Sequence, residues 1–213
     1  MKTTIFYIYD ALCGWCYGFS PVMQDFYEQH KDSFEFTVLS GGMVLGEREG
    51  PVGQIAAFLK EAHKNVESLS GVSFGEAFLN DTLEKGTAHF SSKMPSLALT
   101  ALKDLAPGRS IEQASALQKM VYWYGKSPSV IESYKDVAAQ FDVPFNALKA
   151  SMESDKINQR TEQEFKVVKN WGINGFPTVV LLQGEQGYML SRGFTSIDNL
   201  NETLNRVIEE IKD

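Results

Sequence analysis

Hydrophobic and polar positions divide the chain into strand-like runs near its two ends and a long helical stretch between them. The run TTIFYIY, residues 3–9, is short and rich in β-branched and aromatic residues, which predicts a buried strand. A second strand is predicted for FEFTVLSGGM, ending at Gly41 and Gly42. Near the other end, FPTVVLL and YMLSRG are separated by QGEQG and predict a hairpin.

Apolar residues elsewhere recur at three- to four-residue spacing, which is typical of amphipathic helices. One helix is predicted directly after the first strand, over residues 13–33, with Pro21 expected to kink it or mark a restart. Residues 52–165 have almost no strand signal and predict successive helices. Further helices are predicted from Asp155 to Trp171 and from Ser196 to Lys212.

The order of these elements is strand, helix, strand, a long helical block, helix, two strands and helix. This order predicts an α/β unit interrupted by a helical insertion. We expect residues 1–50 and 155–213 to form the α/β unit and residues 51–154 to form the inserted helical domain. A chain of 213 residues is long enough to bury a sizeable core.

Charge and hydropathy narrow the classes of partner. The net charge of −7 argues against a nucleic-acid surface or an anionic membrane as a partner. No apolar run approaches the roughly 18–20 residues that would span a bilayer. The apolar run at the amino terminus is also too short for a secretory signal. We therefore expect a cytoplasmic protein, in a compartment where a structural disulfide does not persist.

The only two cysteines, Cys13 and Cys16, fall in DALCGWCYGF between the first strand and the first helix. Residues i and i+3 are neighbours at a helix start, so the two sulfurs are within reach of a disulfide. Cys13 would lie at the amino end of the helix, where free N–H groups favour the attacking thiolate. Cys16 would be shielded and could attack the resulting mixed disulfide. Gly14 would keep the approach to Cys13 open, and Trp15 would form an apolar rim beside it.

Two other interpretations of the cysteines are weaker. A structural zinc site would need more ligands, and the three histidines, His30, His63 and His89, show no ligand spacing, so no metal site is expected. Two inert buried cysteines are also conceivable, because free cysteine packs well. A C-x-x-C pair between a strand and a helix is more typical of redox chemistry.

A second motif, GINGFPT, places a proline at the opening of a strand, which is a restricted position. The Phe176–Pro177 bond is therefore a candidate cis peptide. With CGWC after the first strand, a helical insertion, and GFPT before the last hairpin, nearly the whole chain resembles the DsbA-like branch of the thioredoxin superfamily. It is most similar to the cytosolic FrnE-like group of thiol–disulfide oxidoreductases.

The resemblance implies a thioredoxin fold with a helical domain inserted after the second strand. It also implies Cys13 as nucleophile, Cys16 as resolving thiol and a cis Pro177 facing them. The backbone of Phe176 would then be an edge on which an extended substrate could pair, and its ring an apolar surface beside Trp15. Periplasmic members have Pro-His between the cysteines, whereas this chain has Gly14-Trp15. Because these two residues tune the stability of the thiolate, the resemblance does not imply a strongly oxidising redox potential.

The resulting function is disulfide exchange with protein or peptide thiols and small thiols. The cysteine pair is the redox centre, so no bound cofactor is required, and glutathione could serve as a redox partner. Two alternatives remain. One is a glutathione-dependent transferase or isomerase, similar to the kappa-class transferases and the hydroxychromene-carboxylate isomerases, although these usually use a single serine or cysteine. The other is a non-catalytic peptide-binding protein or chaperone.

Several other residues are interpreted as structural. Met43 and the segment Ser92–Ser96 are expected to form a turn and a helix start, although they could approach the site. His89 is expected to be packed or solvated. The aromatic residues Tyr122, Trp123 and Tyr124 are expected to belong to a helix core.

Overall fold

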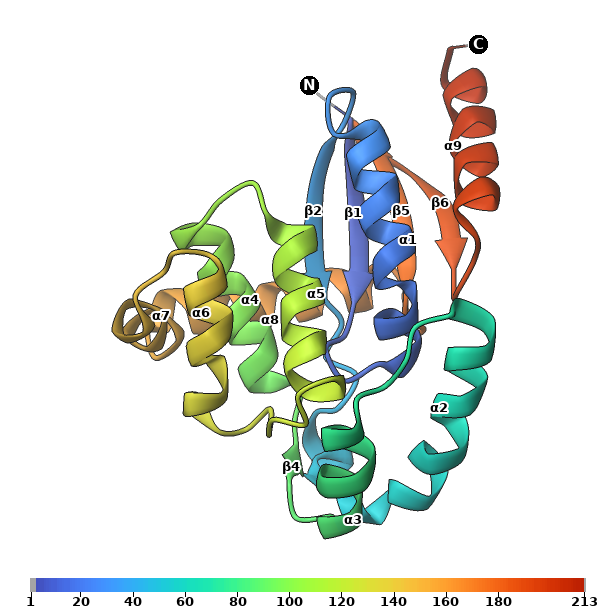
Figure 1. Ribbon diagram of the computed structural model, residues 1–213. Helices are drawn as coiled ribbons and strands as arrows, with labels where there is room; N and C mark the ends of the chain where they lie inside the picture. The colour runs from blue at the N-terminus through green and yellow to red at the C-terminus, as the bar shows by residue number, and fades with distance from the viewer. Residues whose placement is uncertain (1–2, 213) are drawn as a thin grey trace.

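A four-stranded sheet is the framework of the computed structural model, which describes residues 3–212 (Figure 1). Its strands are β1 (Thr4–Tyr9), β2 (Glu35–Ser40), β5 (Thr178–Gln183) and β6 (Gln186–Arg192), in the order β2-β1-β5-β6. Strands β1 and β2 are parallel, whereas β5 is antiparallel to both of its neighbours. All four strands predicted from the sequence are therefore confirmed.

Helices cover both faces of this sheet. Helices α1 (Gly14–His30) and α9 (Ile197–Lys212) pack against each other, and the opposite face holds α8 (Asp155–Asn170). Successive side chains of β1 point to opposite faces of the sheet, and the packing agrees with this. Ile5 belongs to the main core, whereas Ile8 packs with Val168 of α8 on the other face. A sheet with a parallel pair, a terminal hairpin and helices on both faces is the thioredoxin fold that the sequence predicted.

Helix α1 continues through Pro21 without interruption, contrary to a restart at that residue. Proline has no N–H, so the carbonyl of Tyr17 loses its usual partner one turn later. The hydroxyl of Ser20 donates a hydrogen bond to that carbonyl at 2.8 Å instead. This local replacement explains how the helix tolerates the proline.

The segment between β2 and α8 is mostly helical, as predicted. Its helices are α2 (Ala56–Ser70), α3 (Leu83–Lys85), α4 (Lys93–Leu105), α5 (Ser110–Tyr122), α6 (Lys135–Gln140) and α7 (Phe145–Met152), with a π-helical turn at Ala77–Thr82. One detail differs from the prediction. Strands β3 (Gly50–Pro51) and β4 (His89–Phe90) form a two-residue antiparallel ladder, which is too short to give a strand pattern in the sequence.

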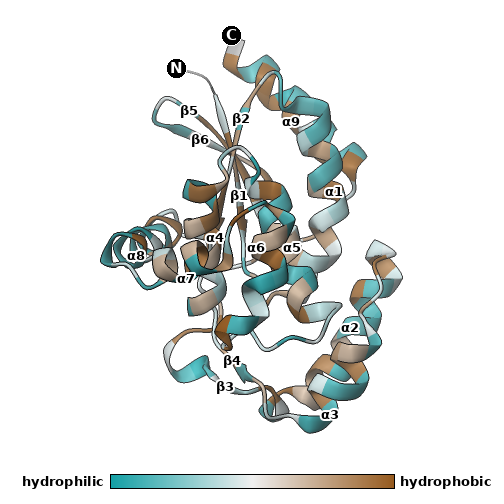
Figure 2. Cartoon of the chain, turned by 60° about the vertical axis from the view of Figure 1, so that its left-hand side comes forward, coloured by the Kyte–Doolittle hydropathy of each residue, from teal (hydrophilic) through white to brown (hydrophobic). Residues whose placement is uncertain are grey.

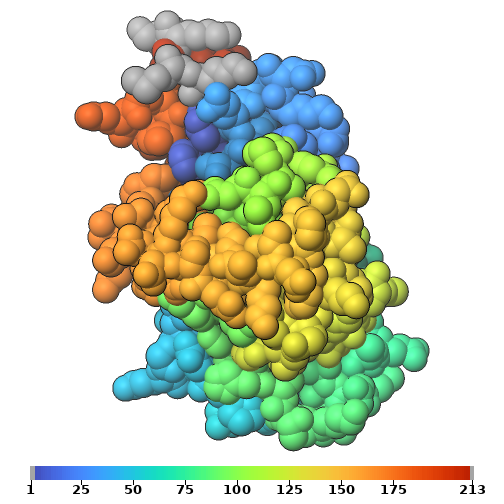
Figure 3. Space-filling view, turned by 90° about the vertical axis from the view of Figure 1, so that its left-hand side faces the viewer, coloured from blue at the N-terminus to red at the C-terminus, as the bar shows by residue number. Residues whose placement is uncertain are grey.

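The inserted helices approach the sheet from two directions. Helix α5 packs against α1 and β2, and α4 packs against α8. Helices α6, α7 and α8 cover the face shown in Figure 3. Helices α2 and α3 lie with β3 and β4 at the end of the molecule away from the two termini (Figures 1 and 2). Helix α2 also reaches α1, where a Cβ on Gly18 would come 2.6 Å from Val66.

Candidate active site

Cys13 caps the amino end of α1. Its backbone is extended, with φ −92° and ψ 111°, and its sulfur accepts a hydrogen bond from the backbone N–H of Cys16 at 3.4 Å. The N–H of Cys13 in turn donates to the carbonyl of Asp10 at 3.1 Å, which fixes the turn before the helix. The sulfur thus lies where helix N–H groups stabilise negative charge.

Cys16 is fully buried one turn further along, whereas Cys13 keeps 6% of its surface exposed. Both are free thiols. Burial and the hydrogen bond with Cys13 raise the pKa of Cys16 well above its usual value, so its protonated form is favoured. The hydroxyl of Tyr7 also donates to the Cys16 carbonyl at 3.5 Å. The pair is therefore asymmetric, with one accessible sulfur and one shielded sulfur.

The loop before β5 lies against this pair, and its Phe176–Pro177 peptide bond is cis. The carbonyl of Phe176 accepts a hydrogen bond from the Cys13 thiol at 3.5 Å. The ring of Phe176 lies against Gly41, where an added Cβ would come 2.2 Å from the ring. The ring also packs against the cluster that contains Ile8. The backbone of Phe176 is thus at the site, but its ring does not line the cavity that Trp15 lines.

A cavity of about 270 Å³ opens beside Cys13, between the start of α1 and helix α2. Gly14 and Trp15 line it together with Cys13, as the sequence predicted. Gly14 does leave room, because a Cβ there would meet nothing nearer than Phe74 at 3.6 Å. The other lining residues are Leu12, Met43, Val44, Ile55, Phe58, Leu59, Ala62, His63, Val66, Phe74, Phe78, Phe90 and Tyr122.

Asp10 is a buried carboxyl at the centre of the site, with 1% of its surface exposed. It accepts hydrogen bonds from the N–H of Leu12 at 2.9 Å, the N–H of Met43 at 2.7 Å and the hydroxyl of Ser92 at 2.8 Å. Burial raises the pKa of Asp10, and these hydrogen bonds partly oppose that shift. Through them, Asp10 joins the turn before Cys13 to the loop after β2 and to the start of α4.

Sequence reasoning missed several of these residues. Asp10 lies three positions before the C-x-x-C pair, and an acidic residue at this position is a signal that the sequence itself contains. Ser92 lies at the start of α4, as predicted, but its hydroxyl also holds Asp10, and Met43 lines the cavity. The prediction that Tyr122, Trp123 and Tyr124 belong to a helix core is correct only for Tyr122, which is buried at the cavity wall. Trp123 and Tyr124 are exposed.

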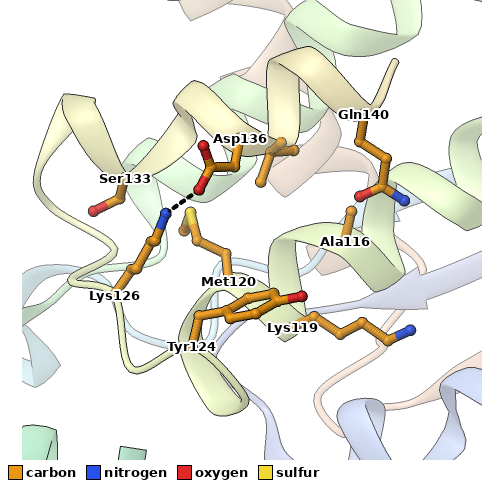
Figure 4. Close-up of a pocket in the computed structure, with 9 residues that line it drawn as sticks. Ala116, Lys119, Met120, Tyr124, Lys126, Ser133, Asp136 and Gln140 are labelled. Carbon is orange, nitrogen blue, oxygen red and sulfur yellow. Dashed lines mark hydrogen bonds and ion pairs between the residues drawn. The ribbon is translucent and has the colours of Figure 1, made fainter. Parts of the chain in front are cut away.

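A larger cavity, of about 420 Å³, lies between α5 and α6 and does not include either cysteine. It contains the ion pair Lys126–Asp136 at 2.5 Å, near Met120 and Tyr124 (Figure 4). Lys126 and Asp136 pair with each other there, and neither is hydrogen-bonded to the hydroxyl of Ser133, so the candidate site is the one at Cys13. Within residues 3–212, no group of three or more His, Cys, Asp or Glu side chains could hold a metal ion. None of the helices in that range is long and apolar enough to cross a membrane.

Several solved structures are similar to this chain over nearly its whole length. No protein-family model matches the chain, and no curated protein matches it. A candidate protein disulfide isomerase from Nitrosomonas europaea superposes with a TM-score of 0.84 at 22% identity, covering 99% of each chain. The cytosolic disulfide reductase DsbM from Pseudomonas aeruginosa gives 0.82 at 22% identity, covering 97% of this chain and 98% of its own. A 2-hydroxychromene-2-carboxylate isomerase gives 0.64 at 12% identity, covering 99% and 98%.

These likenesses cover 97–99% of the chain and establish a thioredoxin fold with an inserted helical segment. DsbM has also been solved with GSH, and that structure superposes with a TM-score of 0.79. At 22% identity or less, the function of this chain has to be argued from its own site.

Proposed function

We propose that the protein is a thiol–disulfide oxidoreductase in which Cys13 is the nucleophile and Cys16 the resolving thiol. The observation that carries this proposal is the asymmetric pair at the start of α1. Cys13 is partly accessible and accepts the N–H of Cys16, whereas Cys16 is buried behind it. An attacking thiol must reach its substrate as a thiolate, and a resolving thiol must reach only the first sulfur.

The proposed reaction has two steps. The Cys13 thiolate attacks one sulfur of a substrate disulfide, which forms a mixed disulfide and releases the other sulfur as a thiolate that takes up a proton. Cys16 then loses its proton and attacks the sulfur of Cys13. This step releases the second substrate thiol and leaves a Cys13–Cys16 disulfide, so that two electrons pass to the substrate. The reverse sequence would oxidise a substrate dithiol.

The backbone of Phe176 is the proposed guide for the substrate chain. Its carbonyl lies 3.5 Å from the Cys13 sulfur, so an extended peptide that pairs along this loop would bring its own sulfur to Cys13. The substrate-binding set in this proposal is Gly14 and Trp15 at the cavity and Phe176 and Pro177 at the loop. Because the Phe176 ring lies on Gly41, only its backbone is assigned this role.

Protein or peptide disulfides and thiols are the proposed substrates, with no cofactor beyond the cysteine pair. Glutathione is a proposed small-thiol partner, and the DsbM structure with GSH supports this choice. A cytoplasmic location is likewise proposed, supported by the similar DsbM, which is described as cytosolic. The isomerase with this fold keeps the glutathione-dependent alternative open, but a second buried cysteine has no role in that alternative.

Trapping of the mixed disulfide tests this function. We expect Cys16→Ser to accumulate a covalent adduct with a disulfide-containing peptide, and mass spectrometry should locate the adduct at Cys13. Cys13→Ser is the matched control and should form none. Adducts on Cys16 in the control would reverse the roles. If neither variant forms an adduct, and a variant without both cysteines still suppresses aggregation of an unfolded protein, the chaperone alternative is correct.

A further inference from the structure

The cavity beside Cys13 has a wall that is almost entirely apolar. Among the 16 residues that line it, only Cys13, His63 and Tyr122 can be titrated, and none is a lysine, arginine, aspartate or glutamate. Tyr122 is buried, and burial raises its pKa well above the usual value, so its hydroxyl stays neutral. A ligand in this cavity therefore finds almost no charge to pair with its own charges.

The lysines of α2 do not supply the missing charge. Lys60 is paired with Glu84 at 2.5 Å, and Lys64 is paired with Glu61 at 2.9 Å. Neither lysine lines the cavity. Glutathione carries two carboxylates and an ammonium close to its cysteine, and each loses hydration on entering an apolar site without gaining a partner. The cavity is thus a poor match for the groups that flank the glutathione sulfur.

We propose that this cavity binds the apolar or aromatic side chain next to the reacting cysteine of a peptide disulfide. The protein would then exchange with such disulfides faster than with glutathione disulfide, although both remain substrates. This inference rests on the proposed function, because the reactive Cys13 sulfur at one end of the cavity defines the occupant as part of a disulfide substrate. Removal of the substrate's apolar surface from water supplies the preference.

His63 provides one polar contact in this wall. Its Nδ1 lies 3.1 Å from the carbonyl of Leu59, and a carbonyl can only accept, so Nδ1 carries the hydrogen. In the neutral imidazole, Nε2 is then an acceptor, and no hydrogen bond to it is made by residues 3–212. The ring is held edge-on against Phe74, with 5.7 Å between centroids. Nε2 can accept a backbone N–H of the bound peptide, which would fix its direction.

Helix α2 also offers a matched pair of positions for testing the cavity. Phe58 and Leu69 both lie on this helix and are 69% and 65% exposed, so substitution of either should leave the core intact. Phe58 lines the cavity, whereas Leu69 does not. A lysine at position 58 would place a positive charge and a polar head at the cavity wall. The same change at position 69 would alter net charge equally without touching the cavity.

The test uses the reduced full-length protein in single-turnover exchange, quenched with acid and counted by mass spectrometry. The substrates are the symmetrical disulfides of N-acetyl-Cys-Phe-amide and N-acetyl-Cys-Ser-amide, and glutathione disulfide. Each rate is divided by the rate of the same disulfide with dithiothreitol, which removes differences in intrinsic reactivity. We expect the phenylalanine disulfide to react about tenfold faster than glutathione disulfide, the size of effect that a well-filled apolar pocket gives. The serine disulfide should fall between them.

Phe58→Lys should lower the rate with the phenylalanine disulfide severalfold and raise the rate with glutathione disulfide, because the lysine gives a glutathione carboxylate a partner at the cavity wall. Leu69→Lys should change neither rate. Equal normalised rates for the three disulfides, or equal effects of the two lysine substitutions, would overturn the preference while leaving the oxidoreductase function intact. If the wild-type protein exchanges with none of the three disulfides, the proposed function itself is refuted.

Discussion

The carboxylate of Asp10 accepts a hydrogen bond from the hydroxyl of Ser92 at 2.8 Å, across 82 positions of sequence. The same hydroxyl accepts the N–H of Val44 at 3.0 Å, and the N–H of Ser92 donates to the Val44 carbonyl at 2.8 Å. Val44 lines the cavity beside Cys13. The buried carboxyl and the serine therefore join the turn before Cys13 to one wall of the cavity.

Ser92→Ala tests this connection. The substitution leaves the buried Asp10 carboxylate without one of its donors, so we expect the free energy of unfolding to fall by about 1–3 kcal/mol. Disulfide exchange should also slow, because the loop that carries Met43 and Val44 loses an anchor. Ser91→Ala is the control, since the Ser91 hydroxyl accepts only the N–H of Lys93. Chemical denaturation and exchange rates measure both effects, and equal losses in the two variants would contradict a special role for Ser92.

The pH dependence of stability reports on Asp10. Burial raises the pKa of this carboxyl in the folded protein, so the native state holds the proton to higher pH than the unfolded chain does. Its contribution to stability is therefore full below the ordinary pKa of about 3.9 and declines as pH rises through the folded value. Asp10→Asn removes this decline, so the stability gap between the wild type and the variant should narrow with increasing pH. A gap that widens between pH 4 and 7 in urea unfolding would mean that the carboxylate is net stabilised by its donors.

Gly41→Ala tests how the Phe176 loop is placed. The new Cβ would come 2.2 Å from the Phe176 ring, which packs against the cluster that contains Ile8, so the ring and the loop that carries it must shift. We expect a loss of about 1–3 kcal/mol in stability and slower disulfide exchange. Gly175→Ala lies in the same loop, where a Cβ meets nothing within 4 Å, and should be nearly silent. Unchanged exchange rates in both variants would show that the position of the loop does not matter.

A nearly buried ion pair between Lys103 and Glu164 joins α4 to α8. Lys103 also donates to the carbonyl of Val38 at 2.8 Å, and Glu164 accepts the N–H of Ser40 at 3.2 Å. Lys103→Met leaves a carboxylate without its partner in this site, so we expect a loss of about 3–5 kcal/mol. Lys64→Met breaks the exposed pair with Glu61 and should cost less than about 1 kcal/mol. Thermal denaturation distinguishes the two, and a similar small loss in both would show that the Lys103 pair is effectively solvated.

Local patterns account for the parts of the fold that the sequence predicted well. Strands β1, β2, β5 and β6 and most helices have clear periodicity or clear breaks, so their positions follow from short windows of sequence. The asymmetry of Cys13 and Cys16 is local too, because both lie in the first turn of one helix. The ladder of β3 and β4 has two residues in each strand, which is too few for a pattern.

Contacts between distant segments could not be predicted in the same way. The proximity of Phe176 to Cys13 was expected only from resemblance to a family, and even then the Phe176 ring was misplaced. Ser92 was missed because a serine at a helix start is usually a cap, and only the fold shows that its partner is Asp10. The apolar cavity wall formed by α2 could not be predicted, because the pattern of an amphipathic helix shows that one face is apolar but not which cavity that face lines.

A redox titration determines whether Cys13 and Cys16 form a reversible disulfide, on which the proposed function depends. The protein would be equilibrated with mixtures of reduced and oxidised glutathione, its free thiols trapped with an alkylating agent, and the products counted by mass spectrometry. We expect one two-electron transition, in which Cys13 and Cys16 lose their free thiols together and the protein loses two hydrogens. Independent modification of the two cysteines, or a stable glutathione adduct with no internal disulfide at any ratio, would contradict it.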